Sequence, residues 1–210
     1  KFFFASQTKG IPGLSDIDIT FALSATSANS NATYTFMQNT LKTFIDKYGA
    51  NQIQYSIIVY GDRVERVVTF NSSFPPTDNQ LKSAIDAQSA LAGGPVLEDA
   101  LQETFKIFNE SKGRPAAKKA LVVVTDNNSG TDKGKLSAAV KTVEEQKVLV
   151  ISVAVGGVVD TNELAIISPN PLDVISTNVN EIPEKVGDRV IDRILRRKEL
   201  FCLLSTEHNW

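Results

Sequence analysis

The spacing of hydrophobic positions changes several times along the chain, and each change predicts a new secondary-structure element. In residues 16–24 apolar side chains occupy every second position, which is typical of a strand. In residues 37–48 they recur every three or four positions, which predicts an amphipathic helix. The same two patterns predict further strands at 52–60, 64–70, 120–124, 148–155 and 174–175, and further helices at 78–85, 97–108, 136–143, 160–167 and 182–194.

The order of these elements indicates the fold class. Only Gly61-Asp62-Arg63 separates the second and third strands, so these two are expected to form an antiparallel hairpin. Helices separate the other strands, and the uninterrupted apolar run at 120–124 is typical of a parallel strand covered on both faces. We therefore predict an α/β fold: a doubly wound, Rossmann-like, mostly parallel six-stranded sheet with one antiparallel edge strand and helices on both faces.

A single domain is expected over residues 16–201, because no linker or repeat interrupts this stretch. Residues 1–15 are interpreted as an N-terminal arm and 202–210 as a C-terminal tail. The missing initiator Met indicates a processed product or an excised domain. Three helix details are also predicted: Asp78 caps the second helix, Pro95 lies in the first turn of the third, and Ile182 belongs to the buried face of the last.

Composition excludes several classes of chemistry. The 210 residues include one Cys and one His, and 22 Lys and Arg face 24 Asp and Glu. Cys202 and His208 alone cannot form a structural zinc site, and any nucleophile–histidine pair would depend on His208 near the C-terminus. A net charge of −2 gives no electrostatic footprint for nucleic acid, and no stretch is long and apolar enough for a membrane span.

Phosphate-binding loops are not apparent either. Ser24–Asn29 stands where a Gly-x-Gly-x-x-Gly loop would follow the first strand. Gly93-Gly94 and the loop that begins at Asp126 could each present backbone N–H groups to an anion. Acidic side chains in the second loop would repel phosphate, and both segments are more typical of turns. A nucleotide-binding protein or enzyme is therefore kept only as an alternative.

Two sets of carboxylates lie at opposite ends of predicted strands. Asp16 and Asp18 begin the first strand, away from the strand ends where ligands bind in such sheets, and are expected to solubilise that edge. Asp126 follows the 120–124 strand, where a carboxylate could hold a hard divalent cation. A second carboxylate would be needed from residues 24–28, and none is present.

Five segments resemble, in order, the successive blocks of a von Willebrand factor type A domain. They are residues 18–24, the helix after them, the hairpin at 55–70, the segment 93–101 and the segment 121–126. The resemblance extends from about Asp16 to Leu195. It implies a Rossmann-like domain, usually extracellular, that binds proteins such as matrix components or adhesion receptors. In many members a Mg²⁺ ion at the top of the sheet forms a metal-ion-dependent adhesion site, where the ligand supplies the last carboxylate.

The metal site implied by this resemblance is degenerate here. The family's Asp-x-Ser-x-Ser falls on Ser24, Thr26 and Ala28, so its Asp is lost. The Thr expected after the Gly pair is Pro95, and only Asp126 keeps the family's residue. One carboxylate and two hydroxyls leave Mg²⁺ short of charge and ligands. We therefore expect no metal and no other cofactor, with Asp126 accepting hydrogen bonds from loop N–H groups.

Three further features bear on localisation and partners. Asn-x-Ser/Thr sequons begin at Asn31, Asn71, Asn109 and Asn127, and favour a secreted glycoprotein. The family's end-to-end disulfide is not available to Cys202, which is expected to be buried among apolar neighbours; a disulfide to another chain is the alternative. A basic cluster at the end of the last helix comprises Arg193, Arg196, Arg197 and Lys198. Its charge suits the helix dipole, and glycosaminoglycan binding is the alternative.

These observations predict a non-catalytic protein-interaction domain of a secreted extracellular-matrix or cell-adhesion protein. Its partner would be an extracellular protein, either a matrix component or a receptor, bound without Mg²⁺. Nucleic-acid binding and membrane insertion are not expected. The alternatives are a metal-dependent adhesion domain with a rebuilt ion site and the nucleotide-binding protein considered above.

Overall fold

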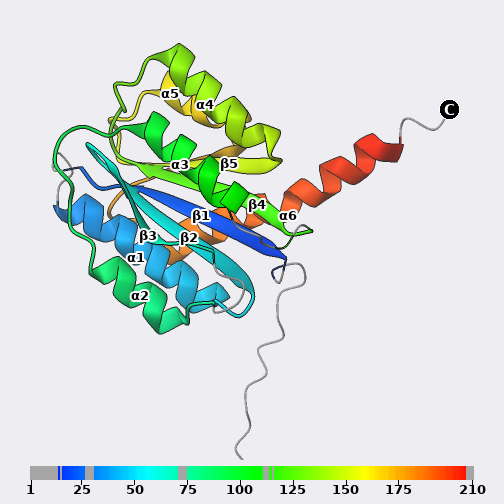
Figure 1. Ribbon diagram of the computed structural model, residues 1–210, viewed down its shortest axis with the longest axis horizontal. Helices are drawn as coiled ribbons and strands as arrows, with labels where there is room; N and C mark the ends of the chain where they lie inside the picture. Colours follow the sequence, from blue (N-terminus) through cyan, green and yellow to red (C-terminus); the bar gives the residue numbers. More distant parts are fainter. Residues whose placement is uncertain are drawn as a thin grey trace, which may run out of the picture.

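A six-stranded sheet forms the centre of the protein, in the strand order β3-β2-β1-β4-β5-β6 (Figure 1). The computed structural model describes residues 14, 16–26, 31–70, 75–110, 114 and 116–206, with side chains as far as Arg196. Five strands run parallel and β3 is antiparallel to β2, as the sequence predicted. The strands are β1 (Ile17–Ser24), β2 (Ile53–Tyr60), β3 (Val64–Val68), β4 (Lys118–Thr125), β5 (Val148–Val155) and β6 (Val174–Thr177).

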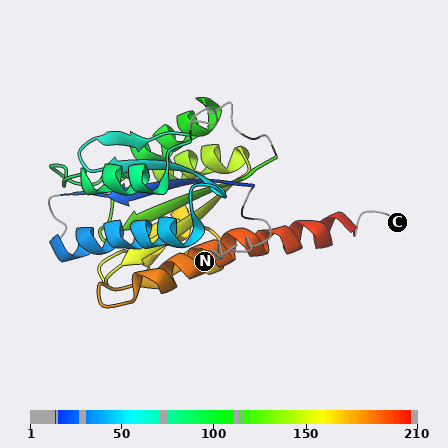
Figure 2. The same cartoon turned by 90° about the horizontal axis from the view of Figure 1, so that it is seen from below.

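Helices cover both faces of the sheet and divide the core into two layers. Side chains of α1 (Asn31–Tyr48), α2 (Asp78–Asp86) and α6 (Pro183–Thr206) pack on one face. Those of α3 (Leu97–Glu110), α4 (Lys133–Glu145) and α5 (Thr161–Ile167) pack on the other. Figure 2 shows α1 and α6 on one side of the sheet and α3 and α4 on the opposite side. A short 3₁₀ turn, Pro171–Asp173, leads into β6.

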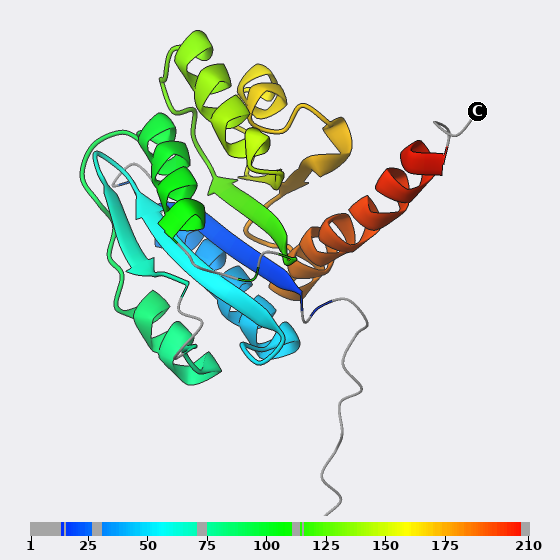
Figure 3. The ribbon, with the colours of Figure 1, turned by 45° about the vertical axis from the view of Figure 1, so that its right-hand side comes forward.

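The long helix α6 is held against α1 by close packing and by charge. A Cβ at Gly187 would lie 3.2 Å from Cδ2 of Phe44, so glycine permits this approach of the two helices. Lys47 pairs with Glu184 and Asp188 at 2.8 Å each, and the Tyr48 hydroxyl donates to Asp188 at 2.6 Å. Beyond these contacts α6 continues to Thr206 and extends away from the sheet (Figure 3).

Three helix details differ from the sequence prediction. Thr77, not Asp78, is the N-cap of α2: it forms a capping box with Gln80, while Asp78 accepts a hydrogen bond from the Ala50 N–H. Pro95 precedes the first turn of α3, because the Val96 N–H is bonded to the Gly61 carbonyl before the helix begins. Ile182 lies outside α6 and is 55 % exposed, so it is not part of the buried face.

Candidate functional site

The candidate site lies at the carboxyl ends of β1 and β4, the two central strands. From β1 the chain winds outward through β2 and β3 on one side, and from β4 it winds outward through β5 and β6 on the other. Open α/β sheets bind ligands at such a reversal of strand order. Ser24 is the last residue of β1, and Asp126 follows the last residue of β4.

Backbone hydrogen bonds fix the loops around this point. The Ala25 N–H donates to the Tyr60 carbonyl at 2.8 Å, and the Ala25 carbonyl accepts from the Leu91 N–H at 2.5 Å. The Asp62 N–H donates to the Ala92 carbonyl at 2.9 Å. These bonds hold the segment with Gly93, Gly94 and Pro95 across the ends of β1 and β2, next to the hairpin turn.

Glycine is required where this segment meets the hairpin. Gly93 has φ of +70°, and a Cβ there would lie 2.9 Å from the Cβ of Asp62. Gly94 has ample space, since a Cβ would meet no atom within 4 Å. The pair therefore serves first as a tight turn that brings two loops into contact.

Most positions of the expected ion site are buried and uncharged. Ser24 and Thr26 are fully buried, and Pro95 is buried as well. Ala28 lies outside the described residues. Asp126 contributes the one carboxylate among the four described positions, and it is half-buried.

The loop around Asp126 is bonded mainly to itself. The Asn127 side-chain amide donates to the Asp126 carboxylate at 3.1 Å. The Thr125 hydroxyl donates to the Asn127 carbonyl at 2.7 Å and accepts from the Asn127 N–H at 3.3 Å. Burial raises the pKa of Asp126 above its ordinary value, and hydrogen bonds from its own N–H and from Asn127 only partly oppose this. The Asp126 carboxylate thus accepts from a neutral side-chain amide, and its predicted role at this edge stays a prediction.

Glu163 also contributes to this edge, although the sequence pattern placed it only within the helix predicted at 160–167. Its buried carboxylate reaches from α5 to accept the Ser129 N–H at 2.9 and 3.2 Å. Asp160, the N-cap of α5, donates its own N–H to the Asn128 side chain at 2.5 Å. The loop between β4 and α4 is thus tied to α5 by an acid that the sequence places 34 residues away.

The residues at this edge do not fit a divalent cation. Mg²⁺ takes near-octahedral oxygen coordination with charge from carboxylates, but Asp126 is the one carboxylate at the family's described positions and Glu163 is engaged by Ser129. Within the described ranges there is no cluster of three or more His, Cys, Asp or Glu side chains arranged to hold a metal.

The opposite edge of the sheet corrects a sequence-based expectation. Asp18 was expected to solubilise this edge, but it is 2 % exposed and pairs with Arg114 at 2.6 Å. Arg114 also donates to the Ile17 carbonyl at 2.6 Å. Burial raises the pKa of Asp18, while Arg114 and Lys119 pull in the opposite direction without restoring the ordinary value. An alternating strand pattern cannot show that a charged side chain has a cationic partner 96 positions away.

The other candidate residues are dispersed over the surface. Asn31 begins α1 and is exposed, Asn109 is exposed near the end of α3, and Asn127 is half-buried; Asn71 lies outside the described residues. Arg193 is half-buried, and Arg196 pairs with Asp192 at 2.7 Å. The side chains of Arg197, Lys198 and Cys202 are also outside the description, so their predicted roles stay predictions.

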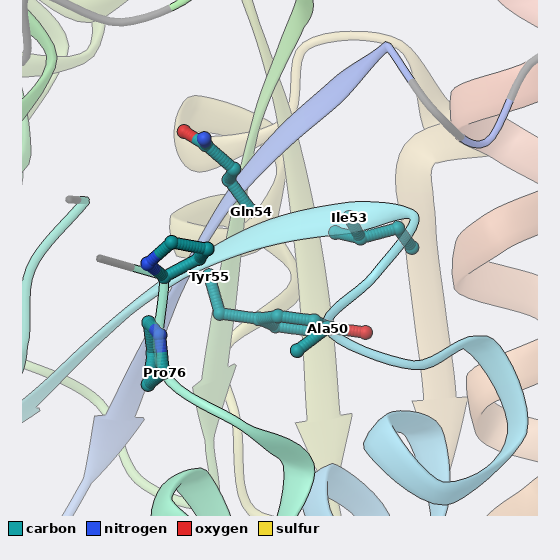
Figure 4. Close-up of a pocket in the computed structure, with 6 residues that line it drawn as sticks. Ala50, Ile53, Gln54, Tyr55 and Pro76 are labelled. Atoms are coloured by element: carbon teal, nitrogen blue, oxygen red, sulfur yellow. The ribbon is translucent and has the colours of Figure 1, made fainter. Parts of the chain in front are cut away.

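A small cavity near the N-terminal end of β2 is not a ligand site. Its volume is about 10 Å³, and it is lined by Ala50, Ile53, Gln54, Tyr55, Pro75 and Pro76. Figure 4 shows Gln54 and Tyr55 directed to opposite sides of the strand. A space of this size holds a single water molecule at most.

Comparison with known proteins identifies the family. The family model of the von Willebrand factor type A domain matches residues 18–186, which are most of the chain. This chain belongs to the von Willebrand factor type A family. The family resemblance and the fold predicted from the sequence are therefore confirmed.

Two curated relatives of this domain are human collagen chains. It is 25 % identical to the collagen α-6(VI) chain over 146 residues, which is 67 % of this chain and 6 % of the collagen chain. It is 28 % identical to the collagen α-5(VI) chain over 118 residues, 55 % of this chain and 4 % of the other. The chain thus spans a small part of these relatives' length.

Solved structures of the same fold include proteins that bear metals. Proximal thread matrix protein 1 from the mussel byssus, with a zinc-occupied MIDAS motif, gives a TM-score of 0.72 at 20 % identity, covering 86 % of this chain and 46 % of that one. Manganese-loaded TRAP protein from Plasmodium vivax gives a TM-score of 0.66 at 14 % identity, covering 84 % of this chain and 74 % of that one. A von Willebrand factor type A protein from Catenulispora acidiphila gives 0.69 at 14 % identity, covering 86 % and 42 %.

The length and apolar character of the helices in the described part of this type A domain bear on membrane crossing. None of them combines the length and the apolar character that a bilayer crossing requires.

Proposed function

We propose that this type A domain is a non-catalytic interaction module that binds an extracellular protein, a matrix component or receptor, without a divalent cation. Two observations support the class of function. The domain belongs to the von Willebrand factor type A family, and its curated relatives include collagen VI chains. An interaction role in the extracellular matrix agrees with both.

The residues at the carboxyl edge of the sheet support the metal-independent part of the proposal. Ser24 and Thr26 are buried hydroxyl residues, and Pro95 has no side-chain oxygen. Asp126 is the one carboxylate at the family's described positions, and burial raises its pKa. A cation held there would lack charge and ligands. Partners must then be recognised by contacts that this chain supplies itself.

The absence of catalysis is also part of the proposal. Asp126 has neither a nucleophile nor a base among the side chains that bond to it, and Glu163 is engaged by a backbone N–H. These arrangements suit hydrogen-bonded loops rather than proton transfer. Thermal-shift screening with ATP, NAD and divalent cations tests this directly: we expect no shift, and a stabilisation by a nucleotide would favour the alternative class.

Two finer partner proposals have less support from the contacts. Polyanion binding would use Arg193, Arg196, Arg197 and Lys198, but Arg196 is already paired with Asp192. A heparin column measures this, and elution at low salt is expected. A disulfide through Cys202 is tested by non-reducing electrophoresis of the wild type beside Cys202→Ser.

The test of the main proposal is a binding assay on immobilised extracellular-matrix proteins. Surface plasmon resonance in Mg²⁺ and then in EDTA should give the same dissociation constant for any protein that binds. A complex that forms only in Mg²⁺, and that Asp126→Ala abolishes, would contradict the proposal and favour a rebuilt ion site.

A further inference from the structure

A surface groove at the carboxyl edge of the sheet has no role in the function proposed above. It lies between the start of α1 and the loop that leads from β6 into α6, and its volume is about 410 Å³. Figure 2 shows these two segments at the same end of the molecule. The groove is open to solvent, so it can accept a bulky group from outside.

The lining combines apolar and hydrogen-bonding surface. Ala32, Val179 and Pro183 supply apolar contact, and Val179 is 40 % exposed. Thr35 and Asn39 supply polar groups. Glu181 also lines the groove, but its carboxylate already accepts from the Thr177 hydroxyl and from Arg189 at 2.7 and 2.8 Å. The groove therefore favours a neutral occupant with both apolar and hydroxyl faces, such as a sugar.

One lining residue is itself an acceptor for a sugar. Asn31 lines the groove and begins the sequon Asn31-Ala32-Thr33. It is exposed, and its side chain forms no hydrogen bond with the residues that the structure describes. Among the described residues, no side-chain hydrogen bond of Asn31 would have to break for this amide to be modified.

The other described sequons are less suited to this modification. The Asn127 amide donates to Asp126 at 3.1 Å, and the residue is half-buried in the loop after β4. The side-chain carbonyl of Asn109 accepts from the Gln146 side-chain amide at 2.7 Å, which fixes the orientation of the Asn109 side chain. Neither residue lines the groove.

We propose that Asn31 carries an N-linked oligosaccharide whose first sugar lies in the groove between α1 and the β6–α6 loop. The Asn31 side-chain nitrogen attacks C1 of an oligosaccharide on a polyisoprenyl-diphosphate donor, and a transferase of the secretory pathway catalyses the step. The N–C1 bond forms, the C1–O bond to the diphosphate breaks, the diphosphate leaves with the electron pair, and the amide proton passes to a base of the transferase. The sugar then covers apolar surface that the fold leaves exposed.

This inference rests on the proposed extracellular function, because the donor and transferase belong to the secretory pathway. It adds a consequence for that function. The glycan would lie beside the carboxyl edge of the sheet, where the family's metal site is degenerate, and would reduce access to this edge. Protein partners would then bind other faces of the domain.

The experiment is site mapping on the full chain, secreted from a eukaryotic host behind a heterologous leader peptide. Peptide-N-glycosidase in ¹⁸O-water converts each glycosylated Asn to labelled Asp, and mass spectrometry of peptides locates the label. We expect the label at Asn31 in most molecules, and loss of one glycan in both Asn31→Gln and Thr33→Ala. Asn127→Gln, the matched control, should leave the glycan pattern unchanged.

Hydrogen exchange tests where the sugar lies. Removing the glycan from folded protein should speed amide exchange at residues 178–182 and leave the turn at 61–63 unchanged. A secreted chain with unmodified Asn31 would overturn the proposal, and modification without any change at 178–182 would overturn the placement in the groove. Neither result bears on metal-independent binding, which surface plasmon resonance in Mg²⁺ and EDTA tests separately.

Discussion

A carboxylate lies directly at each end of the central strands, Asp18 at the start of β1 and Asp126 just after β4, and their surroundings differ. Asp18, at the start of β1, is almost completely buried and bonded to the Arg114 guanidinium at 2.6 Å. Asp126, just after β4, is half-buried and bonded to the neutral amide of Asn127. Burial raises the pKa of both carboxyl groups. The comparison shows that the carboxylate at the start of β1 has a cationic partner, whereas the carboxylate after β4 is bonded to a neutral amide.

The largest effect should come from breaking the ion pair at the start of β1. Arg114→Met leaves the Asp18 carboxylate buried without its cation, and we expect the free energy of unfolding at pH 7 to fall by about 3 kcal/mol. Urea denaturation followed by circular dichroism measures this. The double variant Asp18→Leu/Arg114→Met should recover most of the loss, because an apolar pair of similar size replaces the charges.

A matched control for this variant is Lys42→Ala. Lys42 pairs with Asp86 at 2.7 Å on the surface, and such exposed pairs contribute about 0.5 kcal/mol or less. If Arg114→Met and Lys42→Ala lowered the free energy of unfolding equally, the burial of Asp18 would not make its ion pair more important than an exposed one.

The next effect tests the tight loop contact at the other end. Gly93→Ala should lower the free energy of unfolding by about 2 kcal/mol, because a Cβ is strained at φ +70° and contacts Asp62 at 2.9 Å. Gly94→Ala is the neighbouring control, and its effect should stay within about 0.5 kcal/mol since the space is open. The same denaturation assay separates them, and equal losses would mean that the contact with Asp62 is unimportant.

A somewhat smaller effect is expected from the acid that holds the loop after β4. Glu163→Ala removes the acceptor for the Ser129 N–H and should cost about 1 to 2 kcal/mol. Amide exchange at Ser129 should accelerate in this variant, while Glu163→Gln, which keeps one acceptor oxygen, should change it less. Unchanged exchange in Glu163→Ala would show that other contacts fix the loop.

The smallest effect concerns Asp126 itself and depends on pH. Because its pKa in the folded state is raised above 3.8, its contribution to stability is complete below that pH and is lost as the pH rises through the folded-state pKa. Asp126→Asn should therefore be slightly more stable than the wild type at pH 7, by about 0.5 kcal/mol or less, and equal to it at low pH. Denaturation at a series of pH values checks this, and a variant less stable at pH 7 would indicate that the carboxylate is stabilised by a partner.

The fold was largely predictable because local patterns encode it. The alternation in β1 and the unbroken apolar run in β4 correspond to residues buried in a parallel sheet, and the three-residue turn at Gly61 specified the hairpin. Helix ends were less accurate. Thr77 and Asp78 are adjacent N-cap types, and only the reciprocal bond to Gln80 distinguishes them.

The candidate site was predictable only where its residues share a motif. Ser24, Thr26, Pro95 and Asp126 could be located from their family blocks. Glu163 and Arg114 act through partners 34 and 96 positions away, and no local spacing indicates such pairs. The roles of these two charged residues could therefore be assigned only from the structure.

Isothermal titration calorimetry with Mg²⁺ and Mn²⁺ tests the central claim most directly. A variant with Ser24→Asp, Ala28→Ser and Pro95→Thr restores the family's residues and serves as the positive control, provided that it folds. We predict no binding heat for the wild type up to millimolar cation. Submillimolar binding by the wild type that Asp126→Ala abolishes would contradict this prediction.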